Sequence, residues 1–229
     1  MTPIRFTFAA LLAATTALPA MAQEITPLTD YDATQIEGAW SVDQMRDADV
    51  FGEDGDLIGY VKNIVVGPDR TVQRVVIETD NWLDIGDRVI SVPWDNIDLT
   101  PETDGISAAI DESNMDNFSL FGDDETTDVD GDNYRVSTLL DNYVNLEDGV
   151  GYGYVTDLIF TQDGTLSSML VSPDAGFGDS DYAGGFYAYP YYGDSSYYDQ
   201  AEGLYTLPYG QDEVFGYEPY DASWTDESI

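Results

Sequence analysis

The chain has 229 residues with 45 acidic and 7 basic side chains, a formal net charge of −38, and neither cysteine nor histidine. This composition excludes binding to nucleic acid and disfavours anionic lipid head groups, because both contacts need lysine and arginine. Disulfides and thiol chemistry are impossible, and the usual general base and zinc ligand are missing. The charge is explained first by solubility, and second by attraction for cations or a basic partner.

The N-terminal segment has the three-part layout of a secretory signal peptide. Arg5 supplies the positive charge, residues 6–18 form an apolar stretch, and Ala20 and Ala22 complete a small-x-small triplet. The uninterrupted apolar core, residues 8–14, is far shorter than the roughly 20 residues of a membrane-spanning helix. We therefore expect cleavage after Ala22 and a periplasmic or secreted mature protein without a membrane span.

An internal repeat follows the leader. Shifting the chain by 94 positions aligns residues 42–77 with 136–171 without a gap, and most non-identical pairs exchange similar residues. Such a repeat predicts two related domains. The predicted boundaries are a signal peptide at 1–22, an N-terminal extension at 23–41, a first domain at 42–121, an acidic linker at 122–133, a second domain at 134–221 and a C-terminal tail at 222–229.

Each copy begins with a pattern typical of β-hairpins. A tight Asp-Gly turn precedes a long apolar strand, and a second turn leads to a returning strand. In the first copy these elements are Asp54-Gly55, residues 60–66, the turn at 67–70 and residues 72–78; in the second they are Asp148-Gly149, residues 154–160, the turn at 162–164 and residues 166–172.

The rest of each copy keeps a common order. A proline-containing strand comes first, and proline confines such a strand to an edge or a bulge. A last strand and a short helix then close the unit. These elements are expected at 89–94, 106–110 and 111–118 in the first copy and at 186–191, 204–209 and 211–217 in the second. The predicted class is all-β, with two tandem small antiparallel β-barrels that each bury their own apolar strands and carry a short helix near the end.

The strand-turn-strand pattern at residues 49–61, and again at 143–149 and 153–160, resembles the PRC-barrel domain. Members of this family include the extramembrane part of the photosynthetic reaction centre H subunit and the C-terminal domain of ribosome maturation factors. The leader and the net charge oppose a ribosomal role, and a reaction-centre role would be expected to come with a membrane-spanning helix. The resemblance implies the fold and a protein-binding or scaffolding module.

One candidate metal site lies in the acidic segment between the copies. Asp128, Asp130 and Asp132 have the alternating spacing with which a tight loop can bind calcium. The calcium-loop pattern fails at its sixth and twelfth positions, where Asn133 replaces glycine and Leu139 replaces the bidentate glutamate. A solvated acidic linker is the favoured interpretation, and calcium binding is the alternative.

Two other features have both a structural and a functional interpretation. Gly59 and Gly153 could mark a close approach to a ligand, but a β-bulge is favoured. The tyrosines of residues 182–209 must pack in part inside the second barrel. For those within 193–203 there are two interpretations. They form an exposed surface that binds a protein or a glycan, or they belong to an irregular, flexible loop.

The residue types predict function only broadly. We expect a non-enzymatic exported envelope protein that binds an unknown protein partner, with no catalytic residues and no cofactor. The alternative is an acidic periplasmic protein that binds calcium through residues 122–133. A hydrolase that uses two carboxylates is the remaining enzymatic option, and no pair of acids stands out for it.

Overall fold

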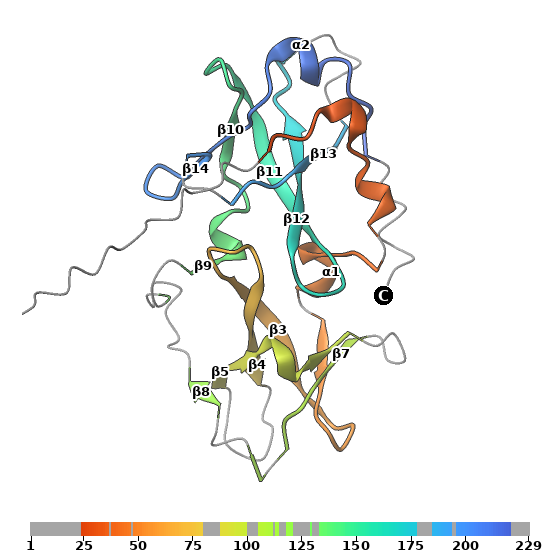
Figure 1. Cartoon of the computed structure of the whole chain (residues 1–229). Coiled ribbons are helices and arrows are strands. Elements are labelled where there is room, and N and C mark those ends of the chain that lie inside the picture. Colours follow the sequence, from red (N-terminus) through yellow and green to blue (C-terminus); the bar gives the residue numbers. More distant parts are fainter. Residues whose placement is uncertain are drawn as a thin grey trace, which may run out of the picture.

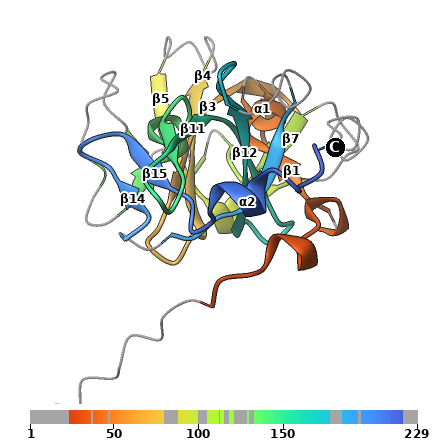
Figure 2. The ribbon, with the colours of Figure 1, turned by 90° about the horizontal axis from the view of Figure 1, so that it is seen from above.

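The structure is a computed structural model. It describes residues 24–36, 38–46, 48–79, 88–99, 105–111, 113–114, 118–120, 129, 133–177, 185–193 and 196–220. In these ranges the chain is mostly strand, and the strands form two sheets. Figure 1 shows the sheets stacked along the long axis of the molecule, and Figure 2 looks down this axis with α2 (Gln211–Val214) at the near end. The predicted all-β class with two barrel-like units is confirmed.

The first sheet is built around the predicted hairpins. Strand β2 (Asp49–Phe51) pairs antiparallel with β3 (Leu57–Val66), and β3 pairs antiparallel with β4 (Val72–Thr79). Gly55 turns between β2 and β3 at φ 78°, and Arg70 turns between β3 and β4 at φ 69°. Positive φ is easy for glycine but uncommon for arginine. The strand order along this sheet is β6-β7-β2-β3-β4-β5-β8, with β5 at Arg88–Pro93, β6 at Ile97–Asp98, β7 at Gly105–Ala108 and β8 at Ser119–Leu120.

The second sheet repeats this core. Strand β10 (Tyr143–Asn145) pairs with β11 (Gly151–Phe160), and β11 pairs with β12 (Leu166–Pro173). The turns again use positive φ, at Gly149 (78°) and Gly164 (82°). The strand order is β13-β12-β11-β10-β15-β14, with β13 at Tyr187–Pro190, β14 at Tyr198–Asp199 and β15 at Leu204–Thr206.

The pairing registers of the two sheets are offset by 94 residues. Val61 faces Ile77 across β3 and β4, and Val155 faces Val171 across β11 and β12. Both sheets also contain a parallel pair at the same place, β2 with β7 and β10 with β15. The repeat seen in the sequence therefore corresponds to two sheets with the same pairing pattern.

Two short strands cross from one sheet to the other. Strand β1 (Trp40–Ser41) precedes the first sheet in the chain, yet it pairs with β11 of the second sheet. Strand β9 (Tyr134–Arg135) precedes the second sheet and pairs with β3 of the first. Residues 40 and 41 were expected in an N-terminal extension, and no sequence pattern predicted this exchange.

A short helical turn follows each crossing strand. Helix α1 (Val42–Met45) follows β1, and the 3₁₀ turn η6 (Val136–Thr138) follows β9. At α1, Ser41 Oγ accepts from the Gln44 N–H at 3.2 Å, and Gln44 Oε1 accepts from the Ser41 N–H at 2.9 Å. This capping box fixes the start of the helix. Further 3₁₀ turns in the described residues are η1 (Leu28–Asp30), η2 (Ala33–Gln35) and η4 (Trp94–Asn96).

The expectation of two separate cores is wrong. Buried residues of both sheets form one continuous apolar cluster that extends from Val50 and Ile106 in the first sheet to Tyr205 in the second sheet and Val214 in α2. The crossing strands explain this continuity, because each places its side chains in the other sheet. Trp40, for example, is 1% exposed and stacks on Phe160 at 4.5 Å between ring centroids.

The predicted terminal helices have different outcomes. In the second copy, the helix expected at 211–217 is present as the shorter α2. In the first copy, residues 112 and 115–117 lie outside the described residues, and the described positions of 111–118 are not helical. Within the described ranges, no helix is long and apolar enough to cross a membrane.

Candidate functional site

The predicted calcium ligands cannot be placed. Asp128, Asp130 and Asp132 lie outside the described residues, so calcium binding there stays a prediction. In the part of the chain that the structure describes, no group of three or more acidic side chains is arranged to hold a metal ion.

The two equivalent glycines of the repeat serve backbone packing. A Cβ atom at Gly59 would lie 2.0 Å from the carbonyl oxygen of Glu78, and one at Gly153 would lie 2.1 Å from that of Ser172. The β2–β3 register also shifts beside Gly59, between Val50 and Phe51. These glycines therefore allow a bulge and a close approach of neighbouring strands, as the favoured interpretation predicted.

Most described tyrosines of the C-terminal third lie in the core. Tyr192 and Tyr209 are buried, and their hydroxyls lie 3.0 Å apart. Tyr197 and Tyr198 lie within the stretch for which an exposed surface was considered, but both are half-buried against the core. Strands β14 and β15 form a hairpin here. The described tyrosines of 196–203 therefore do not form an exposed binding surface.

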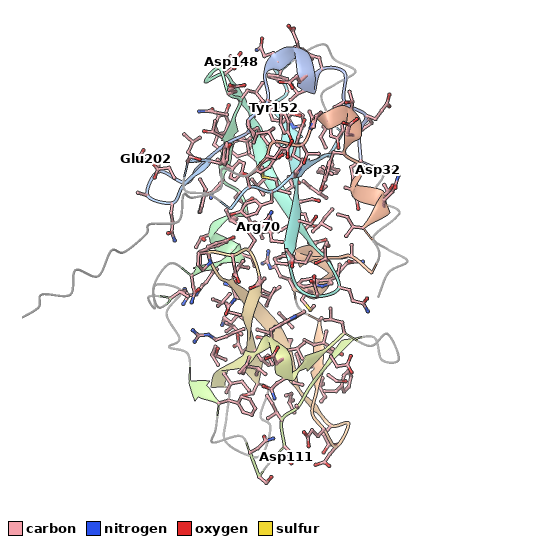
Figure 3. The ribbon with its side chains drawn as sticks, in the orientation of Figure 1. Asp32, Arg70, Asp111, Asp148, Tyr152 and Glu202 are labelled. Carbon is pink, nitrogen blue, oxygen red and sulfur yellow. The ribbon has the colours of Figure 1, made fainter. Side chains whose placement is uncertain are left out.

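One surface hollow lies where the two ends of the described chain meet. It has a volume of about 470 Å³ and is lined by the segment 28–34, residues 216–220 and Ala188 of β13. In Figure 3 the label of Asp32 marks this side of the second sheet. No sequence pattern predicted it, because its two walls are nearly 190 residues apart in the chain.

Hydrogen bonds tie both walls to the second sheet. The hydroxyl of Tyr31 hydrogen-bonds to that of Ser168 in β12. On the opposite wall, the Tyr217 hydroxyl donates to the carbonyl oxygen of Ala188 at 2.8 Å, and the Tyr220 N–H donates to that of Phe186 at 2.6 Å. The hollow is therefore preformed, which lowers the entropy cost of binding.

The hollow carries negative charge and aromatic rings. Hydrogen bonds from the side chains of Thr34 and Gln35 and from the Thr34 N–H lower the pKa of Asp32, so its carboxylate is ionised at neutral pH. Burial raises the pKa of Tyr31 and Tyr217, so both phenols are neutral. The exposed Glu218 adds a second acid, and no lysine or arginine is among the lining residues.

This combination suits an organic cation. A guanidinium or ammonium group can pair with a carboxylate while it packs on a tyrosine ring, and both interactions favour positive charge. A second, more open hollow of about 410 Å³ includes the acids Glu53, Asp95 and Asp98 but no aromatic side chain. It therefore offers charge without the aromatic wall.

The family comparison agrees with the fold. Residues 38–105 match the family model described as the PRC-barrel domain. The matched stretch begins just before β1 and ends at the first residue of β7, so it covers the central strands of the first sheet. No curated protein matches the chain.

Proposed function

Because residues 38–105 match the PRC-barrel domain, we propose that the chain is an exported, non-enzymatic envelope protein that binds a protein partner. A positively charged segment of the partner would bind in the hollow between residues 28–34 and 216–220. The observation that carries this proposal is the acidic, tyrosine-lined and preformed geometry of that hollow.

The available residue types support a binding role over catalysis. The chain lacks histidine and cysteine, so two carboxylates would have to do any acid–base work. Four acids whose pKa is lowered stabilise their own turns through Ser, Thr or Gln side chains, and none of the four is buried. These acids are Asp32, Asp69, Asp111 and Asp163.

Export is supported by the layout of residues 1–22 and by the composition of the remaining chain. A short apolar core followed by Ala20-Met21-Ala22 is typical of a cleaved leader. The large excess of acids keeps the mature protein soluble and attracts basic partners at long range.

Calorimetric titration with a peptide of alternating arginine and glycine tests the binding role. The matched control peptide has glutamine in place of each arginine. We expect saturable binding of the arginine peptide only, weakened about fivefold or more in the double variant Asp32→Asn, Glu218→Gln. Asparagine retains the capping oxygen at position 32, so the local turn is preserved.

Asp95→Asn provides the protein control, because Asp95 lines the hollow that lacks aromatic side chains. This variant should bind the arginine peptide as the parent does. Equal affinity for both peptides, or equal weakening by Asp95→Asn and by the double variant, would show that the hollow is not the site.

A further inference from the structure

The contact between the two sheets, here called the junction, is built from pairs of equivalent residues. Thr71 and Thr165 face each other in an isolated antiparallel bridge, and 94 positions separate them. The flanking hydrogen bonds are related by the same offset. The Val72 N–H donates to the Gly164 carbonyl at 2.9 Å, and the Leu166 N–H donates to the Arg70 carbonyl at 2.8 Å.

The pairs that the crossing strands form are also related by the offset of 94 residues. In β1, Trp40 faces Phe160 and Ser41 faces Ile159 of the second sheet. In β9, the equivalent pairs are Tyr134 with Val66 and Arg135 with Val65 of the first sheet. Each sheet therefore gives its partner a strand and receives the equivalent strand in return.

Side chains also donate hydrogen bonds across the junction. The Trp94 indole N–H donates to the Asp163 carbonyl at 3.2 Å, and the Arg70 Nη1 donates to the Tyr191 carbonyl at 3.1 Å. Trp94 follows the proline that ends β5, and Tyr191 follows the proline that ends β13. In Figure 3 the label of Arg70 lies between the two sheets, midway along the molecule.

An interface in which residue i contacts j, and the equivalent of j contacts the equivalent of i, is the isologous type that joins the subunits of a twofold dimer. We infer that the junction is such a dimer interface closed within one chain. In this interface each barrel-like unit binds the other unit of the same chain as it would bind a second copy of itself. The crossing strands hold the two units together, so the covalent link through the acidic segment 122–133 is not needed for their association.

Cleavage of the folded protein tests this inference. A site for a sequence-specific protease is inserted after Gly122 in the full chain, and the cut protein is passed over a size-exclusion column in native buffer. The inference predicts that the fragments elute together at the position of the uncut protein and separate in denaturant. Separate elution in native buffer would overturn it.

Engineered cysteines test the exchange itself, since the chain has no cysteine of its own. Ser41 and Ile159 are paired residues of neighbouring strands, at a separation suited to a disulfide. After cleavage and oxidation, the variant Ser41→Cys, Ile159→Cys should link the two fragments on a non-reducing gel. In the matched variant Ser41→Cys, Val65→Cys, the second cysteine lies where β1 would pair without exchange.

The matched variant should leave the fragments unlinked, because both of its cysteines lie in the N-terminal fragment. An internal disulfide in that variant, detected by the mass lost on oxidation and by thiol titration, would mean that β1 pairs within its own sheet. Failure of the engineered disulfide between positions 41 and 159 to form, in fragments that elute together, would equally overturn the exchange.

Discussion

Asn63 and Asp157 occupy equivalent positions and accept equivalent hydrogen bonds from the crossing segments. Asn63 Oδ1 accepts from the Ser137 N–H at 3.4 Å, and Asp157 Oδ1 accepts from the Asp43 N–H at 3.1 Å. Each oxygen also accepts from the next residue of its own strand, Ile64 or Leu158. One side of the junction therefore uses a neutral amide where the other side uses a carboxyl group.

This asymmetry predicts a pH-dependent stability. Burial raises the pKa of Asp157, and the charge of Asp43 raises it further, against smaller opposing effects of its hydrogen bonds to Leu158, Ser41 and Asp43. A raised pKa in the folded state means that the folded protein binds the proton more tightly than the unfolded chain does. The contribution of Asp157 to the free energy of unfolding is therefore greatest at low pH and is lost as the pH rises through its pKa.

The variant Asp157→Asn copies the residue at position 63 and removes this dependence. In urea unfolding followed by circular dichroism, we expect the variant to be more stable than the parent at pH 7.5 and similar to it at pH 4. A stability difference that shrinks as the pH rises, or a variant less stable at pH 7.5, would contradict the role assigned to Asp157.

Trp40 is a fully buried side chain that crosses the junction. It stacks on Phe160 and contacts Trp94 at 5.6 Å between ring centroids. Trp40→Ala should lower the free energy of unfolding by about 3–5 kcal/mol, since it empties a buried aromatic site. Leu57→Ala is the control, because Leu57 is 51% exposed and should change stability by about 0.5 kcal/mol or less. Equal effects in chemical unfolding would show that the packing of Trp40 adds little.

Strands β11 and β12 approach each other closely at Gly153, so adding a side chain there should strongly destabilise the protein. Its Cβ would overlap the backbone of Ser172, which cannot move without distorting β12. Gly153→Ala should therefore cost about 2 kcal/mol or more in thermal or chemical unfolding. Gly176→Ala is the matched control, since nothing lies within 4 Å of a Cβ there, and it should leave stability unchanged or slightly raised.

Ionic strength should modulate binding at the proposed hollow. If Asp32 and Glu218 attract a cationic segment, a rise from 50 to 500 mM NaCl should weaken binding of the arginine peptide, because salt screens exposed charges. The affinity measured by calorimetry should fall severalfold. Affinity that is independent of salt would indicate apolar binding instead.

The leader prediction is tested by the mature N-terminus. Expressed in a bacterium that exports proteins, the chain should be recovered from the envelope fraction beginning at Gln23, as read by mass spectrometry. Ala22→Phe should block processing, because the cleavage site requires a small residue. An uncut chain that retains Met1 in the cytoplasm would argue against export.

The central hairpins could be predicted because their signals are local. Asp54-Gly55 and Asp148-Gly149 mark the turns, and largely apolar runs mark β3 and β11. The exchange could not be predicted, since β1 and β9 are only two residues long and strand pairing between distant segments leaves no local pattern. One local pattern near β1 is the Ser41-x-x-Gln44 capping box, which predicts the start of α1 at the residue where the sequence repeat begins.

The candidate site was missed for a related reason. Its aromatic and acidic walls come from segments near opposite ends of the chain, and neither segment carries a motif. The tyrosine-rich composition of residues 193–203 was compatible with an exposed surface, but Tyr197 and Tyr198 are half-buried against the core, so composition alone does not indicate exposure. Large aromatic rings pack the second sheet where the first uses mainly aliphatic side chains.

A single calorimetric scan distinguishes one interlocked body from two sheets that unfold independently. Because the crossing strands and the continuous core couple the sheets, we expect one cooperative unfolding transition in which the calorimetric and van't Hoff enthalpies agree. Two resolved transitions, or a calorimetric enthalpy about twice the van't Hoff value, would show that the sheets unfold independently and would contradict it.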